Sequence, residues 1–270
     1  MDLLIAYLLY PGVIPVGLGT FLFGILVLKR RLVFPTDWRK ALWNVDGFAA
    51  LVSMLLAVGA SIYMPWPYNP VYTSIAGPLL MWAALEIAYL LPPLAAQTAS
   101  SPMVVRGAAR SLQIGLAGRV VIWCVFCALY WANQRWQLNT LPALILAWIA
   151  AVLALPAAIG IGMFRNDTAL TGMMTTGLNI STVALLQIAT DMRAAVLVFA
   201  ITTSVVPVDI ASTALRLALV IVMTLVTLAA MRLLVRNQPF ATLAAALRWC
   251  WWRALPPALL ALGYLAFVVA

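Results

Sequence analysis

The chain of 270 residues contains no histidine, and charged residues make up only 9% of it. Without histidine it lacks the commonest metal ligand and the usual general base at neutral pH, which excludes zinc hydrolases and His-dependent nucleophiles. No two of the acidic residues lie within one helical turn, so magnesium sites built from paired carboxylates are also excluded. The acidic residues are Asp2, Asp37, Asp46, Glu86, Asp167, Asp191 and Asp209. We therefore expect no metal site and no active site contained within this chain.

Hydrophobic residues account for 66% of the chain, well above the roughly 45–50% of a soluble domain. A helix needs about 20 apolar residues to cross a bilayer, and the apolar segments are separated by charged, Pro-rich or Asn-rich breaks. The sequence predicts an all-α integral membrane protein, a single polytopic domain over residues 1–270 with about eight transmembrane helices in one bundle. The predicted spans are about 3–28, 47–66, 74–95, 114–132, 141–164, 182–206, 213–235 and 254–270.

The basic residues are distributed unequally between alternate connections. One side would carry twelve of them and the other only Arg135. The twelve are Lys29, Arg30, Arg31, Arg39, Lys40, Arg106, Arg110, Arg165, Arg232, Arg236, Arg248 and Arg253. Because basic loops remain in the cytoplasm, the chain is expected in the cytoplasmic (inner) membrane with both termini facing outward. The net charge of +9 then indicates contact with the lipid bilayer and not with nucleic acid.

Besides Arg232, which is counted with a basic connection, five charged residues fall within the predicted spans, where each costs about 2.5–3.5 kcal/mol unless it is paired or hydrated. They are Glu86, Arg119, Asp191, Arg193 and Arg216. Glu86 is the only glutamate, and the simplest arrangement pairs it with Arg119 or Arg193, while Asp191 and Arg193 can neutralise each other. Two hypotheses follow: buried ion pairs that fix the packing, or a proton path through carboxyl groups whose pKa is raised by burial. Arg216 is expected to extend to the outer surface.

Other segments have simpler interpretations. Cys124 and Cys127 lie in an apolar run without a second cysteine pair, which favours packing over metal binding. The segment 248–253 (RWCWWR) is expected to be part of the last cytoplasmic connection, with indole rings at the headgroups and guanidinium groups on anionic lipid. The segment 165–181 has helical apolar spacing, and an interfacial amphipathic helix or an ordered loop would both fit it.

Several stretches resemble a known family. The segment 101–110 (SPMVVRGAAR) is similar to the motif S-P-x-x-x-x-G-x-x-R, which lies in a loop before the fourth span in the subunit 1 membrane proteins of respiratory complex I and their counterparts in energy-converting hydrogenases and formate hydrogenlyase. Ser101, Pro102, Gly107 and Arg110 match it. The opening 8–12 (LLYPG) resembles the start of that family's first helix, and 232–257 resembles its basic, aromatic last connection.

The resemblance implies a non-catalytic subunit of an oxidoreductase complex that docks a hydrophilic redox module onto the membrane arm. The implied partners are iron–sulfur redox subunits and antiporter-like membrane subunits, with no redox cofactor bound by this chain alone. Quinone at the interface with a partner and a protein-borne electron carrier both remain open. Docking is expected through basic residues that suit an acidic partner, namely Arg30, Arg31, Arg39, Arg106 and Arg110.

Proton translocation is less well supported by the resemblance, because the family's carboxylates are largely absent. The one expected nine residues after Arg110 is replaced by Arg119, and the family's acidic fifth connection retains only Asp167. The position resembling a family glutamate in the next span falls near Thr190. An alternative from another class is a stand-alone transporter or permease for an anionic or lipid-like substrate, which Arg119, Arg193 and Arg216 would bind within the membrane.

Overall fold

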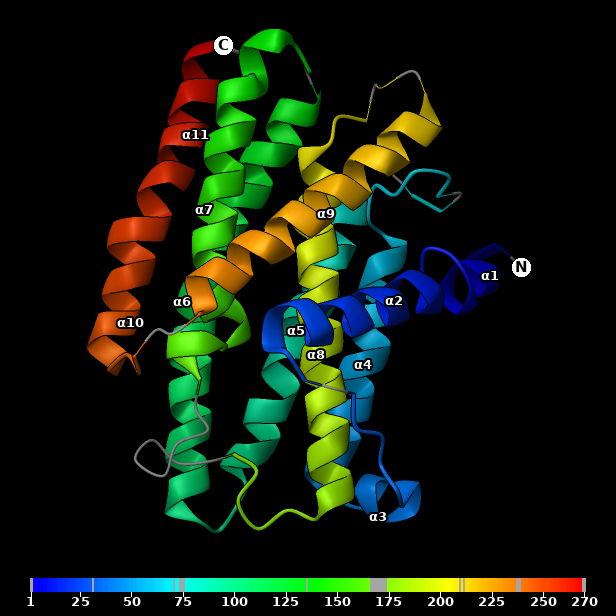
Figure 1. Ribbon diagram of the computed structural model, residues 1–270, viewed down its shortest axis with the longest axis vertical. Helices are drawn as coiled ribbons and strands as arrows, with labels where there is room; N and C mark the ends of the chain where they lie inside the picture. The colour runs from blue at the N-terminus through cyan, green and yellow to red at the C-terminus, as the bar shows by residue number, and fades with distance from the viewer. Residues whose placement is uncertain are drawn as a thin grey trace. The chain divides into compact units, whose positions relative to one another are not determined.

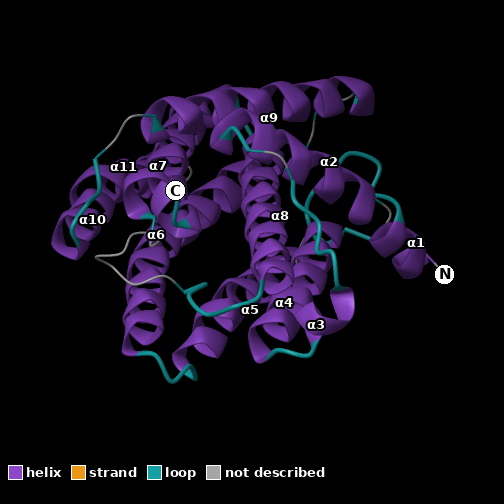
Figure 2. Cartoon of the chain, turned by 60° about the horizontal axis from the view of Figure 1, so that its bottom comes forward, coloured by secondary structure: helices purple, strands orange, loops and turns teal. Residues whose placement is uncertain are grey.

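The computed structural model describes residues 2–30, 32–69, 71–72, 76–134, 136–165, 174–208, 210, 212–236 and 239–268. All regular secondary structure in these residues is helical (Figure 2). Eight helical segments are long and apolar enough to cross a membrane, which confirms the predicted fold class. They are Leu3–Leu28, Val45–Ile62, Gly77–Gln97, Pro102–Asn133, Leu138–Phe164, Ile180–Val205, Thr213–Val235 and Leu243–Val268. The chain is a multi-pass membrane protein.

By contacts, the chain divides into two compact units. The first comprises Met1–Leu112 with Asn166–Leu197, and the second comprises Gln113–Arg165 with Val198–Ala270. The long helices α6 (Pro102–Gln134) and α8 (Ile180–Val205) contribute to both. That the eight spans act as one domain stays a prediction, and each unit is described by itself below.

In the first unit, the first span is broken. Helix α1 (Asp2–Leu8) ends before Pro11, and α2 (Val13–Phe23) continues into a π-helical turn, Gly24–Leu28. At the break the Gly12 amide donates to the Ala6 carbonyl, and a Cβ at Gly12 would lie 1.9 Å from the Tyr7 carbonyl oxygen, so only glycine fits. In Figure 1, α2 is steeply inclined to α4.

The rest of the first unit is built on a helical hairpin. Helices α4 (Val45–Ile62) and α5 (Gly77–Gln97) pack against each other along their length. The short helix α3 (Trp38–Leu42) precedes α4 in a tight turn, where a Cβ at Gly47 would lie 1.8 Å from the Ala41 carbonyl oxygen. Buried Ala41 and Ala50 pack against residues 185–189 of α8. These small side chains let the backbones approach closely, as is common between membrane helices.

In the second unit, α7 (Leu141–Ile159) packs against both α9 (Thr213–Val235) and α11 (Leu255–Val268). The Trp148 indole donates to the Thr227 hydroxyl at 3.0 Å, which links α7 to α9. The end of α7 also lies directly on α6, because a Cβ added at Gly118 would be 2.4 Å from the Ala158 nitrogen. Backbone contact through a glycine therefore sets the spacing of α6 and α7.

Most predicted spans agree with the structure within a few residues, and 213–235 coincides with α9. The fourth begins earlier than predicted, since Pro102 opens α6 and the expected loop at 101–110 is helical. Proline suits the first position of a helix, and Val104 and Ala108 are buried against Ala96, which stabilises these extra turns. At 33 residues α6 is about 50 Å long, so it exceeds the roughly 30 Å hydrocarbon layer.

The last span also begins earlier than predicted. Helix α10 (Leu243–Trp249) and a π-helical turn, Cys250–Ala254, lead directly into α11, so the expected connection at 248–253 is helical. The Thr242 hydroxyl accepts the Ala245 amide at 3.2 Å and caps this helix. The amphipathic helix considered for 165–181 falls partly on 166–173, which lie outside the described residues. Residues 174–177 form a turn before α8.

We predict that Gly118→Ala lowers the free energy of unfolding by about 1–3 kcal/mol, because the added methyl group would overlap the backbone at Ala158. The matched control is Gly263→Ala in α11, where a Cβ has open space. This control should be neutral or raise stability by about 0.5–1 kcal/mol through helix propensity. Reversible unfolding of the detergent-solubilised variants measures both values, and equal effects of the two changes would contradict the packing argument.

Candidate functional site

The candidate site is a group of charged and polar side chains in the first unit, between the hairpin and α8. We call it the arginine cluster, defined by Arg30, Ser53, Ala88, Asp191 and Arg193. It contains an ion pair in which Arg30 Nη2 lies 2.6 Å from Asp191 Oδ1. The Asp191 side chain is 1% exposed and that of Arg30 is 37% exposed, so a buried carboxylate meets a cation that reaches the surface.

The position of Arg30 follows from how the first span ends. Lys29 adopts a left-handed conformation with φ of 52°, which stops the π-helical turn Gly24–Leu28. The Arg30 amide then bonds to the Gly24 carbonyl at 3.1 Å. The sequence allowed Asp191 and Arg193 to neutralise each other, and the structure gives Asp191 an ion pair with Arg30, 161 residues away. No short-range pattern encodes a contact of this kind.

Arg193 has protein acceptors on three of its nitrogens. Nε donates to the Ala189 carbonyl at 3.1 Å, Nη1 to the Ala88 carbonyl at 3.0 Å, and Nη2 to the Thr190 hydroxyl at 3.0 Å. Its guanidinium carbon lies 5.1 Å from the centre of the Tyr89 ring, which adds a cation–π contact. Arg193 is 5% exposed, so these bonds are buried.

The Ala88 carbonyl is available to Arg193 because of a proline one turn later. In a regular helix the amide of residue 92 would donate to this carbonyl, but Pro92 has no amide hydrogen. A carbonyl without a partner is costly in a bilayer, where no water replaces the lost bond. The Ser53 hydroxyl of α4, at 2.8 Å, and Arg193 of α8 both donate to it. Pro92 thereby creates the acceptor that joins three helices.

The remaining charged residues of the predicted spans lie elsewhere. Glu86 is half-buried on α5 in the first unit, and its pairing with Arg119 or Arg193 stays a prediction. Arg119 and Arg216 belong to the second unit. Arg119 is 5% exposed and lies against Gly115, where an added Cβ would be 2.9 Å from Nη1. Seventeen residues beyond Pro102, it lies about 26 Å along α6.

Arg216 does not extend outward as the sequence suggested. It is 8% exposed, near the start of α9. The transporter hypothesis needs arginine side chains that can receive a substrate, whereas the Arg193 nitrogens bond to the protein's own oxygens. In the described part of the chain, no three His, Cys, Asp or Glu side chains come together in a metal-binding group.

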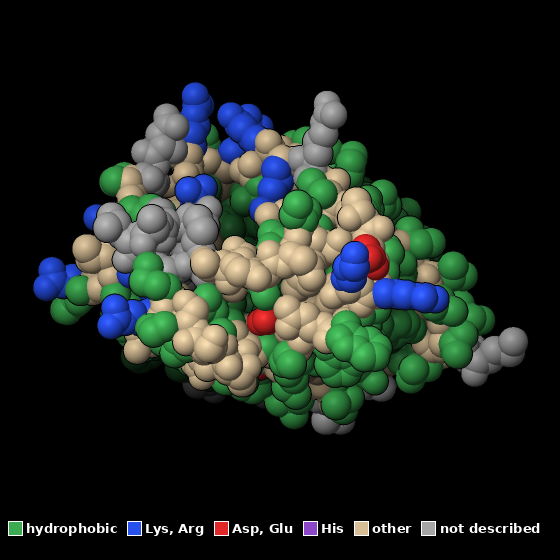
Figure 3. Space-filling view, turned by 90° about the horizontal axis from the view of Figure 1, so that it is seen from below, with side chains coloured by type: hydrophobic (Ala, Val, Ile, Leu, Met, Phe, Trp, Pro, Cys, Tyr) green, Lys and Arg blue, Asp and Glu red, His purple; other side chains and the backbone are tan. Residues whose placement is uncertain are grey.

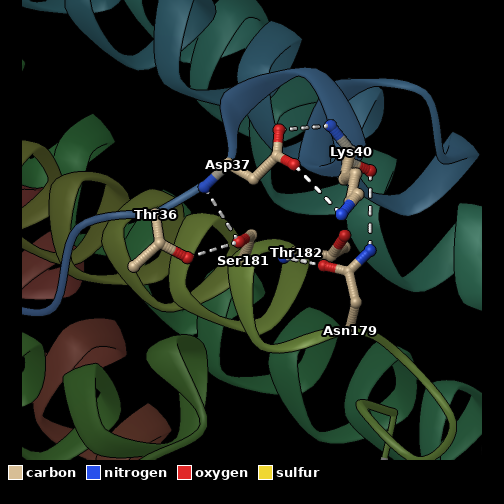
Figure 4. A network of polar contacts seen from close by, with 6 residues as sticks. All are labelled: Thr36, Asp37, Lys40, Asn179, Ser181 and Thr182. Atoms are coloured by element: carbon tan, nitrogen blue, oxygen red, sulfur yellow. Dashed lines mark hydrogen bonds and ion pairs between the residues drawn. The ribbon is translucent and has the colours of Figure 1, made fainter.

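A second polar network ties α3 to the start of α8 (Figure 4). Asp37 caps α3 by accepting the Lys40 amide at 3.1 Å, and its other oxygen lies 3.4 Å from Lys40 Nζ. The Ser181 hydroxyl accepts the Asp37 amide and bonds to the Thr36 hydroxyl, both at 3.2 Å. At the start of α8, Asn179 Oδ1 accepts the Thr182 amide at 2.7 Å. The Lys40 amide, with smaller effects of the Lys40 side chain, holds the pKa of Asp37 below its usual value.

The residues predicted to dock a partner differ in accessibility. Arg39 on α3 and Arg106 on α6 are exposed, and Arg110 is half-buried one turn after Arg106. Arg30 forms an ion pair with Asp191, and Arg31 lies outside the described residues. Lys and Arg side chains are prominent on the face seen in Figure 3, where Asp and Glu side chains are sparse. Among the predicted docking residues that the structure describes, Arg39 and Arg106 are therefore the exposed ones.

The comparisons with known proteins show the fold. No family model and no curated protein matches the chain. Among solved structures, it is similar to a chain in the structure of the membrane-bound sulfane sulfur reductase (MBS), an archaeal respiratory membrane complex. The TM-score is 0.63 at 21% sequence identity, over 92% of this chain and 94% of that chain. This chain thus has the fold of a membrane-complex subunit along nearly its whole length.

We predict that removing both donors to the Ala88 carbonyl lowers the free energy of unfolding by more than the sum of the two single changes. In Ser53→Ala, Arg193 still donates to this carbonyl, and in Arg193→Met, Ser53 still does. The double variant leaves the carbonyl unsatisfied, so its loss of unfolding free energy should exceed the sum by about 1–3 kcal/mol. Unfolding of the four proteins in detergent measures the excess.

The control for this cycle is Pro92→Ala in the double variant. Alanine restores an amide that can donate to the Ala88 carbonyl within α5, so most of the excess loss should disappear. Additive single changes, or no recovery with Pro92→Ala, would show that this carbonyl does not couple the three helices.

A pH dependence is expected at α3. Because the pKa of Asp37 is lowered in the folded chain, its capping contribution is complete above the unfolded pKa and is lost as pH falls through the folded pKa. Amide exchange in residues 38–42 should therefore accelerate, relative to unstructured amides, in acid below about pH 4. Asp37→Asn should abolish this acid-dependent step, and a step of unchanged size in that variant would assign it to another group.

Proposed function

We propose that this chain is a membrane subunit of a respiratory-type oxidoreductase complex and a divergent member of the subunit 1 family. In this role it joins a hydrophilic iron–sulfur redox module to antiporter-like membrane subunits and carries no redox centre of its own. The observation that supports it best is the fold shared with the MBS chain over 92% of the residues. The match of Ser101, Pro102, Gly107 and Arg110 to the family motif is independent support.

The proposed docking surface is formed by Arg39 and Arg106. Both side chains are exposed on ends of helices of the first unit, and α6 is long enough to carry Arg106 past the hydrocarbon layer. A basic surface suits an acidic face of a soluble partner and would speed its association. This proposal puts the basic ends in the cytoplasm, with both termini facing outward across the inner membrane. A quinone acceptor would then lie between this chain and the partner.

The arginine cluster fits a structural role in such a subunit better than a proton path. Within the described spans, the carboxylates are Asp46, Glu86 and Asp191, and Asp191 is bound to Arg30. Arg193 brings a second fixed positive charge to the same region of α8. Proton transfer requires a carboxyl group that is free to change charge, whereas Asp191 is held in an ion pair that a proton would break. The proposal therefore gives this chain the task of holding the complex together.

The test is mass spectrometry of the proteins that co-purify with the tagged chain from native membranes in a mild detergent. Iron–sulfur and antiporter-like subunits in stoichiometric amounts are expected. The variant Arg39→Gln/Arg106→Gln should weaken retention of the soluble subunits by roughly two- to fivefold for each arginine, with the membrane subunits retained. The matched control is Arg248→Gln/Arg253→Gln, which removes two exposed arginines from the second unit and should retain all subunits.

A chain that purifies alone or as a homodimer would contradict the proposal and return attention to the transporter hypothesis. Equal loss of soluble subunits in both double variants would show that total charge matters and that Arg39 and Arg106 form no specific surface.

A further inference from the structure

The segment 248–253 (RWCWWR) forms a two-sided surface in the second unit. Its inward side is firmly packed: the Trp249 indole donates to the Leu153 carbonyl at 2.9 Å, and its ring meets Phe164 edge-on with centres 6.2 Å apart. Cys250 is fully buried in a cluster with Ile114 and Ala246. These contacts hold one face of α10 and the following π-helical turn against the unit.

The outward side carries the other four residues of the segment. Arg248, Trp251, Trp252 and Arg253 are exposed, and Trp252 is 78% exposed. Residues three and four apart share a helix face, which places Arg248 beside the two tryptophans. The Arg253 guanidinium carbon lies 4.6 Å from the centre of the Trp249 ring. Because Trp249 is anchored, this stacking holds the Arg253 cation in place at the surface.

These cations have almost no counter-charge in their own unit. The sequence of the second unit contains eight arginines and a single carboxylate, Asp209, which lies outside the described residues. The ion pairs Arg30–Asp191 and Lys40–Asp37 both belong to the first unit. An anion that binds Arg248 and Arg253 therefore has few competing carboxylates in the sequence of this unit.

The apolar surface next to Arg248 and Arg253 indicates which kind of anion would bind there. The helix continues without interruption into α11 (Figure 1), whose Leu259 and Leu260 are 52% and 62% exposed. Arg253 lies six residues before Leu259, about 9 Å along the axis, which is the step from acyl chains to phosphates in a bilayer. Exposed tryptophans next to the exposed leucines of a membrane span are typical of the headgroup layer.

We propose that Arg248 and Arg253 form a binding site for the phosphate of an anionic phospholipid, with Trp251 and Trp252 in the headgroup layer beside it. The stacked Arg253 and the anchored Trp249 pre-organise the site, which reduces the entropy lost on binding. The lipid supplies the negative charge that this half of the sequence lacks. This inference does not depend on the proposed membership in an oxidoreductase complex.

The experiment measures phosphatidylglycerol binding to the purified full chain by native mass spectrometry, with phosphatidylcholine as the neutral reference. Arg248→Gln and Arg253→Gln should each weaken the first phosphatidylglycerol binding step by roughly fivefold, with phosphatidylcholine unchanged. Arg253→Lys keeps the charge but loses planar stacking, so it should lie between wild type and Arg253→Gln. Soluble glycerophosphate should not compete, because it lacks the acyl chains.

The matched control is Arg39→Gln/Arg106→Gln, which removes equal charge from the first unit and should bind phosphatidylglycerol like wild type. All the changed side chains are exposed, and unfolding in phosphatidylcholine verifies that the variants remain folded. Unchanged phosphatidylglycerol binding in Arg248→Gln/Arg253→Gln would overturn the lipid site. If the same variant also lost soluble subunits on co-purification, the surface would be a protein interface instead.

Discussion

The first unit depends on one backbone carbonyl that its own helix cannot satisfy. Pro92 removes the amide that would bond to Ala88, inside a span where water is not available. The bonds from Ser53 and Arg193 meet this requirement, and in doing so they fix α4 and α8 against α5. A buried arginine would be difficult to explain as an isolated charge. Arg193 donates to this carbonyl, to the Ala189 carbonyl and to the Thr190 hydroxyl, and these bonds explain why an arginine lies inside the span.

The features that the sequence predicted are those governed by local composition. The eight spans follow from hydropathy, because each long apolar run forms a helix. Helix ends were less predictable, because Arg106 and Arg248 were taken to mark connections. In the structure both arginines belong to helices. The neighbouring side chains of Val104 and Cys250 are buried, and this packing stabilises the additional helical turns.

The site could be predicted in its residue types but not in its pairings. Asp191 and Arg193 were identified because charge in a span is costly. Arg30 could not be assigned to Asp191, since that contact depends on the π-helical turn and the left-handed Lys29 that end the first span. Ser53 carried no signal, because serine is common in membrane helices. The one available clue was Pro92, which marks Ala88 as a carbonyl in need of an external donor.

The two polar networks of the first unit together explain how a short helix can hold Arg39, the proposed docking residue, in a defined place. The segment from Arg30 to Asp37 is bound to α8 at both ends, through Asp191 at one end and Ser181 at the other. These two α8 residues are ten positions apart, about 15 Å along one rigid helix. Helix α3 begins directly after the second attachment and is capped there by Asp37. Arg39 therefore projects from a helix whose start is fixed to α8, and α8 is in turn held to the hairpin through Arg193 and the Ala88 carbonyl. A partner that binds Arg39 would contact a surface whose position is set by the bonds inside the membrane, which is the property a scaffold subunit requires.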